Sequence, residues 1–186
     1  VHGDRDSGLA RLASRPGVAY MKVVVLAGPE SSGKSWLSAQ LHQHFGGLLV
    51  GEYVRHFMAG HPRDTCLADI PAIARGQLAW EDAARAQQPP LLILDTHLLS
   101  NMLWSTTLFG ACPDWLEPGL LSRHYDMHLL LSPEDVEWTP DGLRCQPSLA
   151  ERQYFFEQSR DWLQRHAQPL RIIRGSWQDR QASAMD

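Results

Sequence analysis

One eight-residue run, Gly28-Pro-Glu-Ser-Ser-Gly-Lys-Ser35, constrains the fold of this chain more than any other feature. It matches the pattern GxxxxGK[ST], in which a glycine-rich turn joins a strand to a helix. Residues 23–27 before it are short, apolar and rich in valine, which predicts a buried parallel strand. Residues 36–45 after it predict a helix that Gly46 and Gly47 close. The motif therefore has the strand–turn–helix context of a phosphate-binding loop.

The rest of the chain alternates apolar runs with helical patterns. We predict further strands at 48–50, 91–95, 127–131 and 170–173. We predict helices at 69–88, 97–109, around 113–124, at 148–166 and briefly at the carboxyl terminus. Asp69 is the expected N-cap of the first of these, and Ser148 with Glu151 has a capping-box pattern. This alternation predicts an α/β fold, with a five-stranded parallel sheet covered by helices on both faces.

Length and charge limit the classes of protein that this chain can belong to. With 186 residues it can form one ordinary globular domain, which we place at 21–186. Residues 1–20 lack a periodic apolar face and are predicted to be a flexible, dispensable leader. The net charge is −4 and the 17 basic residues are scattered, which argues against a nucleic-acid-binding face. No apolar stretch approaches the roughly 20 residues of a membrane span.

Cysteine usage indicates a compartment. Cys66, Cys112 and Cys145 are odd in number, far apart, and without the spacing of a zinc site. They favour inert thiols in a reducing, cytoplasmic environment.

The phosphate-binding loop predicts an ATP site. Its glycines let successive N–H groups converge on an anion, and the helix N-terminus adds a favourable potential. We expect Lys34 to reach the β- and γ-phosphates and Ser35 to ligate Mg²⁺. The residues predicted to bind the nucleotide are Gly28, Glu30, Ser31, Ser32, Gly33, Lys34, Ser35 and Trp36.

Two carboxylates follow strands at the edge where open parallel sheets bind ligands. Asp95 ends the strand Leu-Leu-Ile-Leu-Asp and can hold Mg²⁺ or orient a reacting hydroxyl; the alternative is a simple turn residue. Glu52 can accept a proton or grip a sugar diol; the alternative is a solvated helix-start residue. Tyr53 and Arg55 follow it and are predicted to face the substrate, although Arg55 alone is equally consistent with a surface position.

Residues 133–147 are polar and contain three prolines, which predicts a mobile loop that we name the lid loop. Arg144 lies within it and Arg152 follows on the next helix. Either arginine can close on the charge that phosphoryl transfer spreads over the moving group. Trp104 is a candidate stacking platform for a base, although its apolar helix favours core packing. The histidines, His97 among them, are expected to be surface or packed residues.

The runs Gly28–Ser35 and Gly51-Glu-Tyr-Val-Arg55, with Asp95-Thr96 and Asp141-Gly-Leu-Arg144, resemble a known family. They are similar to the ribosylnicotinamide kinase domain of the bifunctional NAD-biosynthesis regulator, a P-loop kinase and AAA-like ATPase domain. The resemblance covers most of the chain from Met21. It implies a nucleoside- or nucleotide-kinase-like fold with a lid, ATP and Mg²⁺ as cofactors, and a small-molecule nucleoside as partner. Homo-oligomerisation is left open.

This resemblance implies phosphorylation of the ribose 5′-hydroxyl of nicotinamide riboside to nicotinamide mononucleotide. Carried over by position, Lys34, Asp95, Glu52, Arg144 and Arg152 are catalytic and Ser35 with Asp95 holds the metal. Glu52, Tyr53, Arg55, Asp95 and Trp104 would contact the riboside. One departure concerns His97, where relatives often carry an acidic residue, and this places the acceptor in question. Two alternatives are a kinase for another nucleoside or small alcohol, and a non-enzymatic ATP-binding module.

Overall fold

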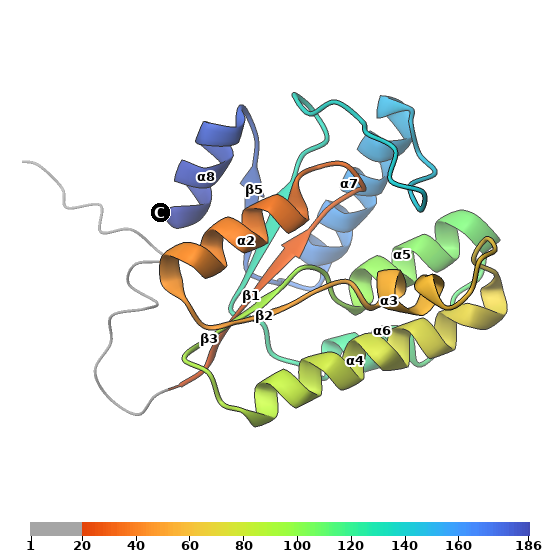
Figure 1. Ribbon diagram of the computed structural model, residues 1–186, viewed down its shortest axis with the longest axis horizontal. Helices are drawn as coiled ribbons and strands as arrows, with labels where there is room; N and C mark the ends of the chain where they lie inside the picture. Colours follow the sequence, from red (N-terminus) through yellow and green to blue (C-terminus); the bar gives the residue numbers. More distant parts are fainter. Residues whose placement is uncertain (1–19) are drawn as a thin grey trace, which may run out of the picture.

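A computed structural model describes residues 20–186 and shows a parallel sheet between two layers of helices (Figure 1). The predicted leader lies, except for Tyr20, outside the described residues. The strands are β1 (Lys22–Ala27), β2 (Leu48–Val50), β3 (Leu91–Leu94), β4 (Met127–Leu131) and β5 (Leu170–Ile173). The helices are α2 (Lys34–Phe45), α3 (Tyr53–Ala59), the 3₁₀ turn η1 (Leu67–Asp69), α4 (Ile70–Ala86), α5 (Leu98–Phe109), α6 (Leu116–Leu121), α7 (Leu149–Arg165) and α8 (Trp177–Met185).

The five strands are all parallel and lie in the order β2-β3-β1-β4-β5. β1 is central, and its neighbours β3 and β4 come from later in the chain. The chain therefore changes direction across the sheet beside the carboxyl end of β1. Ligands bind at such a point in open α/β sheets, and the phosphate-binding loop follows β1 directly.

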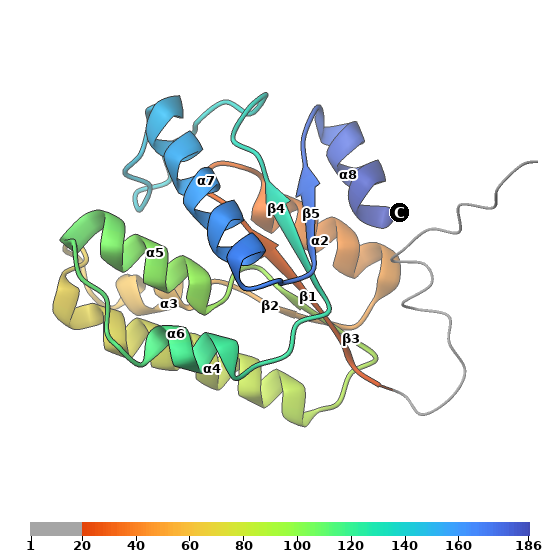
Figure 2. The same cartoon turned by 180° about the vertical axis from the view of Figure 1, so that it is seen from behind.

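Helices cover both faces of the sheet, as the sequence predicts. α2 and α8 pack together on one face, and α4, α5, α6 and α7 cover the other (Figures 1 and 2). Because both faces are covered, the central strands are apolar throughout: Val23, Val24, Val25 and Leu26 of β1 are at most 2% exposed. No helix within residues 20–186 is long and apolar enough to cross a membrane.

The structure corrects four details of the expected elements. It adds α3, whose seven residues bury only Met58 and pack on α4, so that periodicity gives little signal. α6 is shorter than the predicted 113–124, and Pro118 and Gly119 lie within it. The capping box at Ser148 is not formed, because the Ser148 side chain makes no cap hydrogen bond. Asp69 does precede α4, but its carboxylate binds Arg63 and the N–H of Cys66 instead.

Candidate active site

The phosphate-binding loop runs from Gly28 to Gly33, between β1 and α2. Gly28 has φ 129°, and a Cβ there would lie 2.6 Å from the carbonyl oxygen of Leu131 on β4. Gly33 has φ 91°, and its Cβ would meet the indole of Trp177 at 2.5 Å. Both positions therefore require glycine, for backbone conformation and for space.

Two polar side chains of the motif, Ser32 and Lys34, turn onto the backbone of the loop itself. Ser32 Oγ and Lys34 Nζ both donate to the Pro29 carbonyl, at 2.8 and 2.7 Å. Lys34 is the first residue of α2 and is 9% exposed, so its ammonium group stands at a helix N-terminus with little water around it. A cation and a helix N-terminus together provide the electrostatics that bind phosphate.

Arg180 of α8 anchors this loop from behind, and sequence reasoning missed it. It is fully buried, and its guanidinium donates to the carbonyls of Ser32 (3.3 Å), Ser132 (3.0 Å), Glu134 (2.6 Å) and Gly175 (2.8 Å). These carbonyls come from the phosphate-binding loop, the residues after β4 and the residues after β5. Arg180 therefore joins three loops at the carboxyl edge of the sheet.

We expect Arg180→Met to lower the free energy of unfolding by about 3 kcal/mol, because it leaves several buried carbonyls without donors. Thermal unfolding measures this loss. The control is Arg171→Met, which removes one hydrogen bond of 2.7 Å to the Ser183 carbonyl. Equal losses from the two variants would show that the four hydrogen bonds of Arg180 stabilise the fold no more than the one hydrogen bond of Arg171.

Asp95 follows β3 and is almost completely buried. Its N–H donates to the Val50 carbonyl at 2.8 Å, which extends the sheet by one residue. Its Oδ1 atom is buried and has no hydrogen-bond partner within residues 20–186. Burial, together with the negative charge of Glu52, raises the pKa of Asp95 to about 7, although Ser35 and Lys34 act in the opposite direction. The Asp95 carboxyl group therefore lies near Lys34, Ser35 and Glu52, which the sequence analysis assigned to the same site.

This surrounding fits a metal ion. A buried carboxylate oxygen without a partner, beside Ser35, offers oxygen ligands of the type that Mg²⁺ prefers. Within the described part of the chain, no group of three or more His, Cys, Asp or Glu residues could hold a metal. A site with so few protein ligands suits Mg²⁺, which proteins usually bind with one or two side chains while substrate phosphates supply further oxygen ligands.

Glu52 begins the acceptor side of the site and is held by α4. It is the N-cap residue of α3. Gln77 of α4 is 2% exposed, accepts from the Tyr53 N–H at 2.8 Å and donates to the Gly51 carbonyl at 3.1 Å. One buried amide therefore fixes the backbone on both sides of Glu52. Nothing in the local sequence marks Gln77 for this role, since its partners lie at least 24 positions away.

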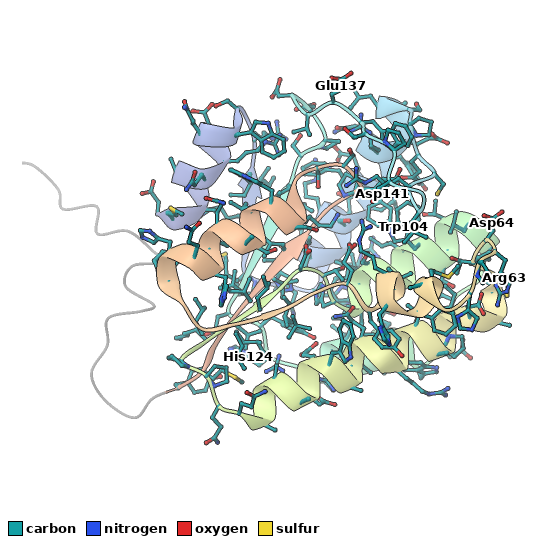
Figure 3. All side chains as sticks on the ribbon, viewed as in Figure 1. Arg63, Asp64, Trp104, His124, Glu137 and Asp141 are labelled. Atoms are coloured by element: carbon teal, nitrogen blue, oxygen red, sulfur yellow. The ribbon has the colours of Figure 1, made fainter. Side chains whose placement is uncertain are left out.

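Arg55 connects Glu52 to the lid loop. Its Nε donates to Glu52 Oε2 at 2.8 Å, and its Nη2 lies 2.8 Å from Asp141 Oδ2. Asp141 also pairs with Arg144 Nε at 3.2 Å, and Arg144 Nη1 donates to Ser31 Oγ at 3.4 Å. Arg144 therefore links the lid loop to the phosphate-binding loop, and its predicted action on the transferred group stays a prediction. Figure 3 shows Asp141 and Trp104 on this side of the molecule, with His124 at the opposite end of the sheet.

A cavity of about 370 Å³ lies between these groups, within the usual range for small-molecule sites. It brings together most of the residues that the sequence predicted: Glu30, Ser31, Ser32, Gly33, Lys34, Ser35, Trp36, Glu52, Arg55, Trp104 and Arg144. Trp104 lines it and also packs on Phe155 at 4.8 Å between ring centroids, while its role as a stacking platform for a base stays a prediction. Sequence reasoning missed Trp177, Asn101 and Gln77, which also line the cavity.

Four predicted residues are not among those that line the cavity. Gly28 follows β1 and Asp95 follows β3, as described above. The Tyr53 ring packs edge-on against Trp80 of α4, at 4.9 Å between centroids. Arg152 is 4% exposed, and its Nη1 donates to the Val136 carbonyl at 3.3 Å, so it supports the base of the lid loop. His97 is buried against His128, with 3.2 Å between their Nε2 atoms, which confirms a packed residue.

Comparison with known proteins identifies the family. A family model described as AAA domain (AAA_28) matches residues 23–180, which is most of the chain. The chain belongs to this AAA domain family. The trifunctional NAD biosynthesis/regulator protein NadR of Escherichia coli (strain K12) is 26% identical over 140 residues, which are 73% of this chain and 34% of that protein. The chain thus spans about one third of the length of the curated relatives it matches.

Solved structures agree on the fold of this family member. NadR protein in complex with NR superimposes with a TM-score of 0.64 at 16% identity, covering 85% of this chain and 45% of that one. Deoxyadenosine kinase from M. mycoides with bound dATP gives a TM-score of 0.62 at 12% identity, covering 88% and 97%. The α/β fold with a five-stranded parallel sheet is thus that of the nucleoside- and nucleotide-kinase-like P-loop proteins.

Proposed function

We propose that this protein is an ATP-dependent kinase that phosphorylates the ribose 5′-hydroxyl of nicotinamide riboside and releases nicotinamide mononucleotide. The observation that carries the proposal is the meeting of a phosphate-binding loop with Glu52, which lines the cavity, and with the buried Asp95 near Ser35 and Lys34. The similarity to NadR, both in sequence and in the structure containing NR, supports the choice of acceptor.

ATP is proposed to bind along the phosphate-binding loop, with Lys34 and the N-terminus of α2 facing its phosphates. Ser35 and Asp95 would hold Mg²⁺, which supplies charge neutralisation when bound. Trp177 and Trp36, with ring centroids 4.9 Å apart, form an aromatic edge of the cavity. These residues bind and orient the donor before any bond changes.

The transfer forms a bond between the ribose 5′-oxygen and the γ-phosphorus and breaks the bond from that phosphorus to the β-phosphate oxygen, releasing ADP. The hydroxyl proton needs an acceptor, and we assign it to the Asp95 carboxylate, which a bound Mg²⁺ would keep ionised. Glu52, one strand outward, holds the sugar hydroxyls. Arg144 lies across the phosphate-binding loop and stabilises the charge of the transferred group.

The same site is compatible with a second acceptor class, another nucleoside or small alcohol. The fold is shared with a deoxyadenosine kinase, and the phosphate-binding loop reports only the donor. A non-enzymatic ATP-binding module is a further alternative. A cytoplasmic location is also proposed, in agreement with the free thiols of Cys66, Cys112 and Cys145.

The test is a coupled measurement of ADP and of phosphorylated product, with nicotinamide riboside and with a panel of purine and pyrimidine nucleosides. We expect nicotinamide riboside to give the highest kcat/KM and one product per ADP. A better purine or pyrimidine substrate would move the assignment to the second class. ATP binding without transfer to any acceptor would favour the regulatory module.

Glu52→Gln separates acceptor binding from chemistry. We expect the KM for the riboside to rise roughly 10- to 100-fold, because hydrogen bonds to a charged group contribute about 1.5–3 kcal/mol. Steady-state kinetics at saturating ATP measure this change. The control is Glu157→Gln on α7, which removes a surface pair with Arg160 and should alter neither constant. A pure loss of kcat in Glu52→Gln would instead make Glu52 the proton acceptor.

A further inference from the structure

Glu30 occupies the third position of the phosphate-binding loop, where the sequence predicts a nucleotide contact, yet its carboxylate binds the lid loop. Oε1 accepts from the indole Nε1–H of Trp138 at 2.8 Å and from the N–H of Gln146 at 2.7 Å. Oε2 accepts from the N–H of Cys145 at 3.1 Å. One side chain thus receives three donors from a segment more than 100 positions away.

These donors come from both limbs of the lid loop, which are the segments before and after Asp141 at its tip. Trp138 lies on the segment that leaves β4, whereas Cys145 and Gln146 lie on the segment that returns to α7. Ser31 adds to the first attachment, because its Oγ accepts from the Thr139 N–H at 2.9 Å. Residues 30 and 31 therefore hold the two limbs of the lid loop together and against the phosphate-binding loop.

The charge of Glu30 makes a direct phosphate contact unfavourable. An ionised carboxylate close to the triphosphate would repel it, and such like-charge contacts cost free energy when water is scarce. Here both oxygens are occupied by N–H donors, and hydrogen bonds to an ionised acceptor are the stronger kind. The carboxylate is thereby committed to the lid loop and not to an anion.

We propose that Glu30 is a positioning residue that fastens the lid loop over the phosphate-binding loop, so that Arg144 is held at the transferring phosphate and water is kept out. The proposal rests on the proposed kinase activity for its catalytic consequence. Arg55 and Asp141 make a second attachment, 2.8 Å long, at the tip of the same loop on the acceptor side. Glu30 secures the two limbs, and Arg55 secures the tip.

Glu30→Gln tests the attachment itself without any substrate. Glutamine keeps the size but offers one acceptor oxygen and an amide nitrogen that faces an N–H donor. We expect amide hydrogen exchange of residues 145 and 146 to become at least about tenfold faster in the protein alone. Trp138→Phe, which removes only the indole donor, should give a smaller increase at the same amides. Glu157→Gln on α7, which removes a surface pair with Arg160, is the control and should leave exchange unchanged.

The catalytic consequence is read from coupling between hydrolysis and transfer. In Glu30→Gln we expect the ratio of ADP released to acceptor phosphorylated to rise severalfold, because a loosened lid loop admits water, while the KM for ATP changes little. A purely structural defect would lower both reactions together and leave the ratio unchanged.

Unchanged exchange at residues 145 and 146, together with a raised KM for ATP, would overturn the proposal and return Glu30 to the nucleotide. Unaltered exchange in both Glu30→Gln and Trp138→Phe would overturn it as well, even if one variant folded poorly. If the wild-type protein phosphorylates no acceptor, the proposed function fails, but faster exchange in Glu30→Gln still establishes the attachment. The two failures are thus distinguishable.

Discussion

Lys34→Ala is expected to lower turnover by on the order of 10²–10³-fold, the usual cost of removing one preorganised electrostatic contact to a developing charge. Lys34 is the only lysine of the motif at 28–35, and its ammonium group stands at the N-terminus of α2 with 9% of the residue exposed. Steady-state turnover at saturating ATP measures the loss. The melting temperature should change little, because one hydrogen bond to the Pro29 carbonyl contributes only about 1 kcal/mol.

The matched control is Lys22→Ala, since the chain contains only these two lysines. Lys22 begins β1 at the opposite edge of the sheet and pairs with Asp126 at 3.0 Å. Its loss should lower stability slightly and leave turnover intact. Turnover near the wild-type value in Lys34→Ala would contradict the assignment of the donor site.

The order of strands and helices could be predicted because each signal lies within a few neighbouring residues. β2, β4 and β5 have the predicted bounds, and Gly46 ends α2 as expected. α3 escaped prediction because its stability comes from contact with α4 and not from its own periodicity. Strand pairing was predicted only as parallel, and the order β2-β3-β1-β4-β5 came from the structure.

Prediction of the site was limited in the same way, because only signals within a few neighbouring residues could be recognised. Loop residues such as Gly33 and Lys34 follow a motif, and their place at the cavity was predicted. Arg180 and Gln77 act through backbone groups from distant segments, and a sequence shows them only as an arginine and a glutamine in helices. The orientation of Glu30 is equally nonlocal, because its partners are N–H groups of the lid loop whose position only the fold determines.

Asp95→Asn is expected to remove activity and to stabilise the fold. An amide cannot accept the hydroxyl proton and is a weaker metal ligand, so kcat should fall by about 10²–10⁴-fold. Riboside binding, measured by calorimetry, should persist because Glu52 remains. Loss of binding with kcat retained would exchange the roles of the two acids. The control is Asp161→Asn, which changes an exposed carboxylate on α7 that pairs with Arg160 at 2.9 Å.

The stability gain depends on pH in a defined direction. The pKa of Asp95 is raised from 3.8 to about 7 in the folded protein, so folding favours the protonated acid. Its contribution is fully present below pH 3.8 and is lost as the pH rises toward and through about 7. Asp95→Asn avoids this loss and should unfold several degrees above the wild type at pH 8, with a smaller difference at pH 5. A difference in melting temperature that does not change with pH would contradict the raised pKa.

The ionisation of Asp95 that lowers stability as the pH rises should increase the catalytic rate. Wild-type kcat/KM for ATP, which reports the enzyme before nucleotide and metal bind, should rise with pH as Asp95 ionises near 7. The charge of Glu52 is one cause of the raised pKa, so Glu52→Gln should move this rise to lower pH. If kcat/KM rises at the same pH in Glu52→Gln as in the wild type, the two carboxylates do not interact. The buried Asp95 carboxylate therefore lowers the free energy of unfolding at the same pH at which the proposed reaction requires its negative charge.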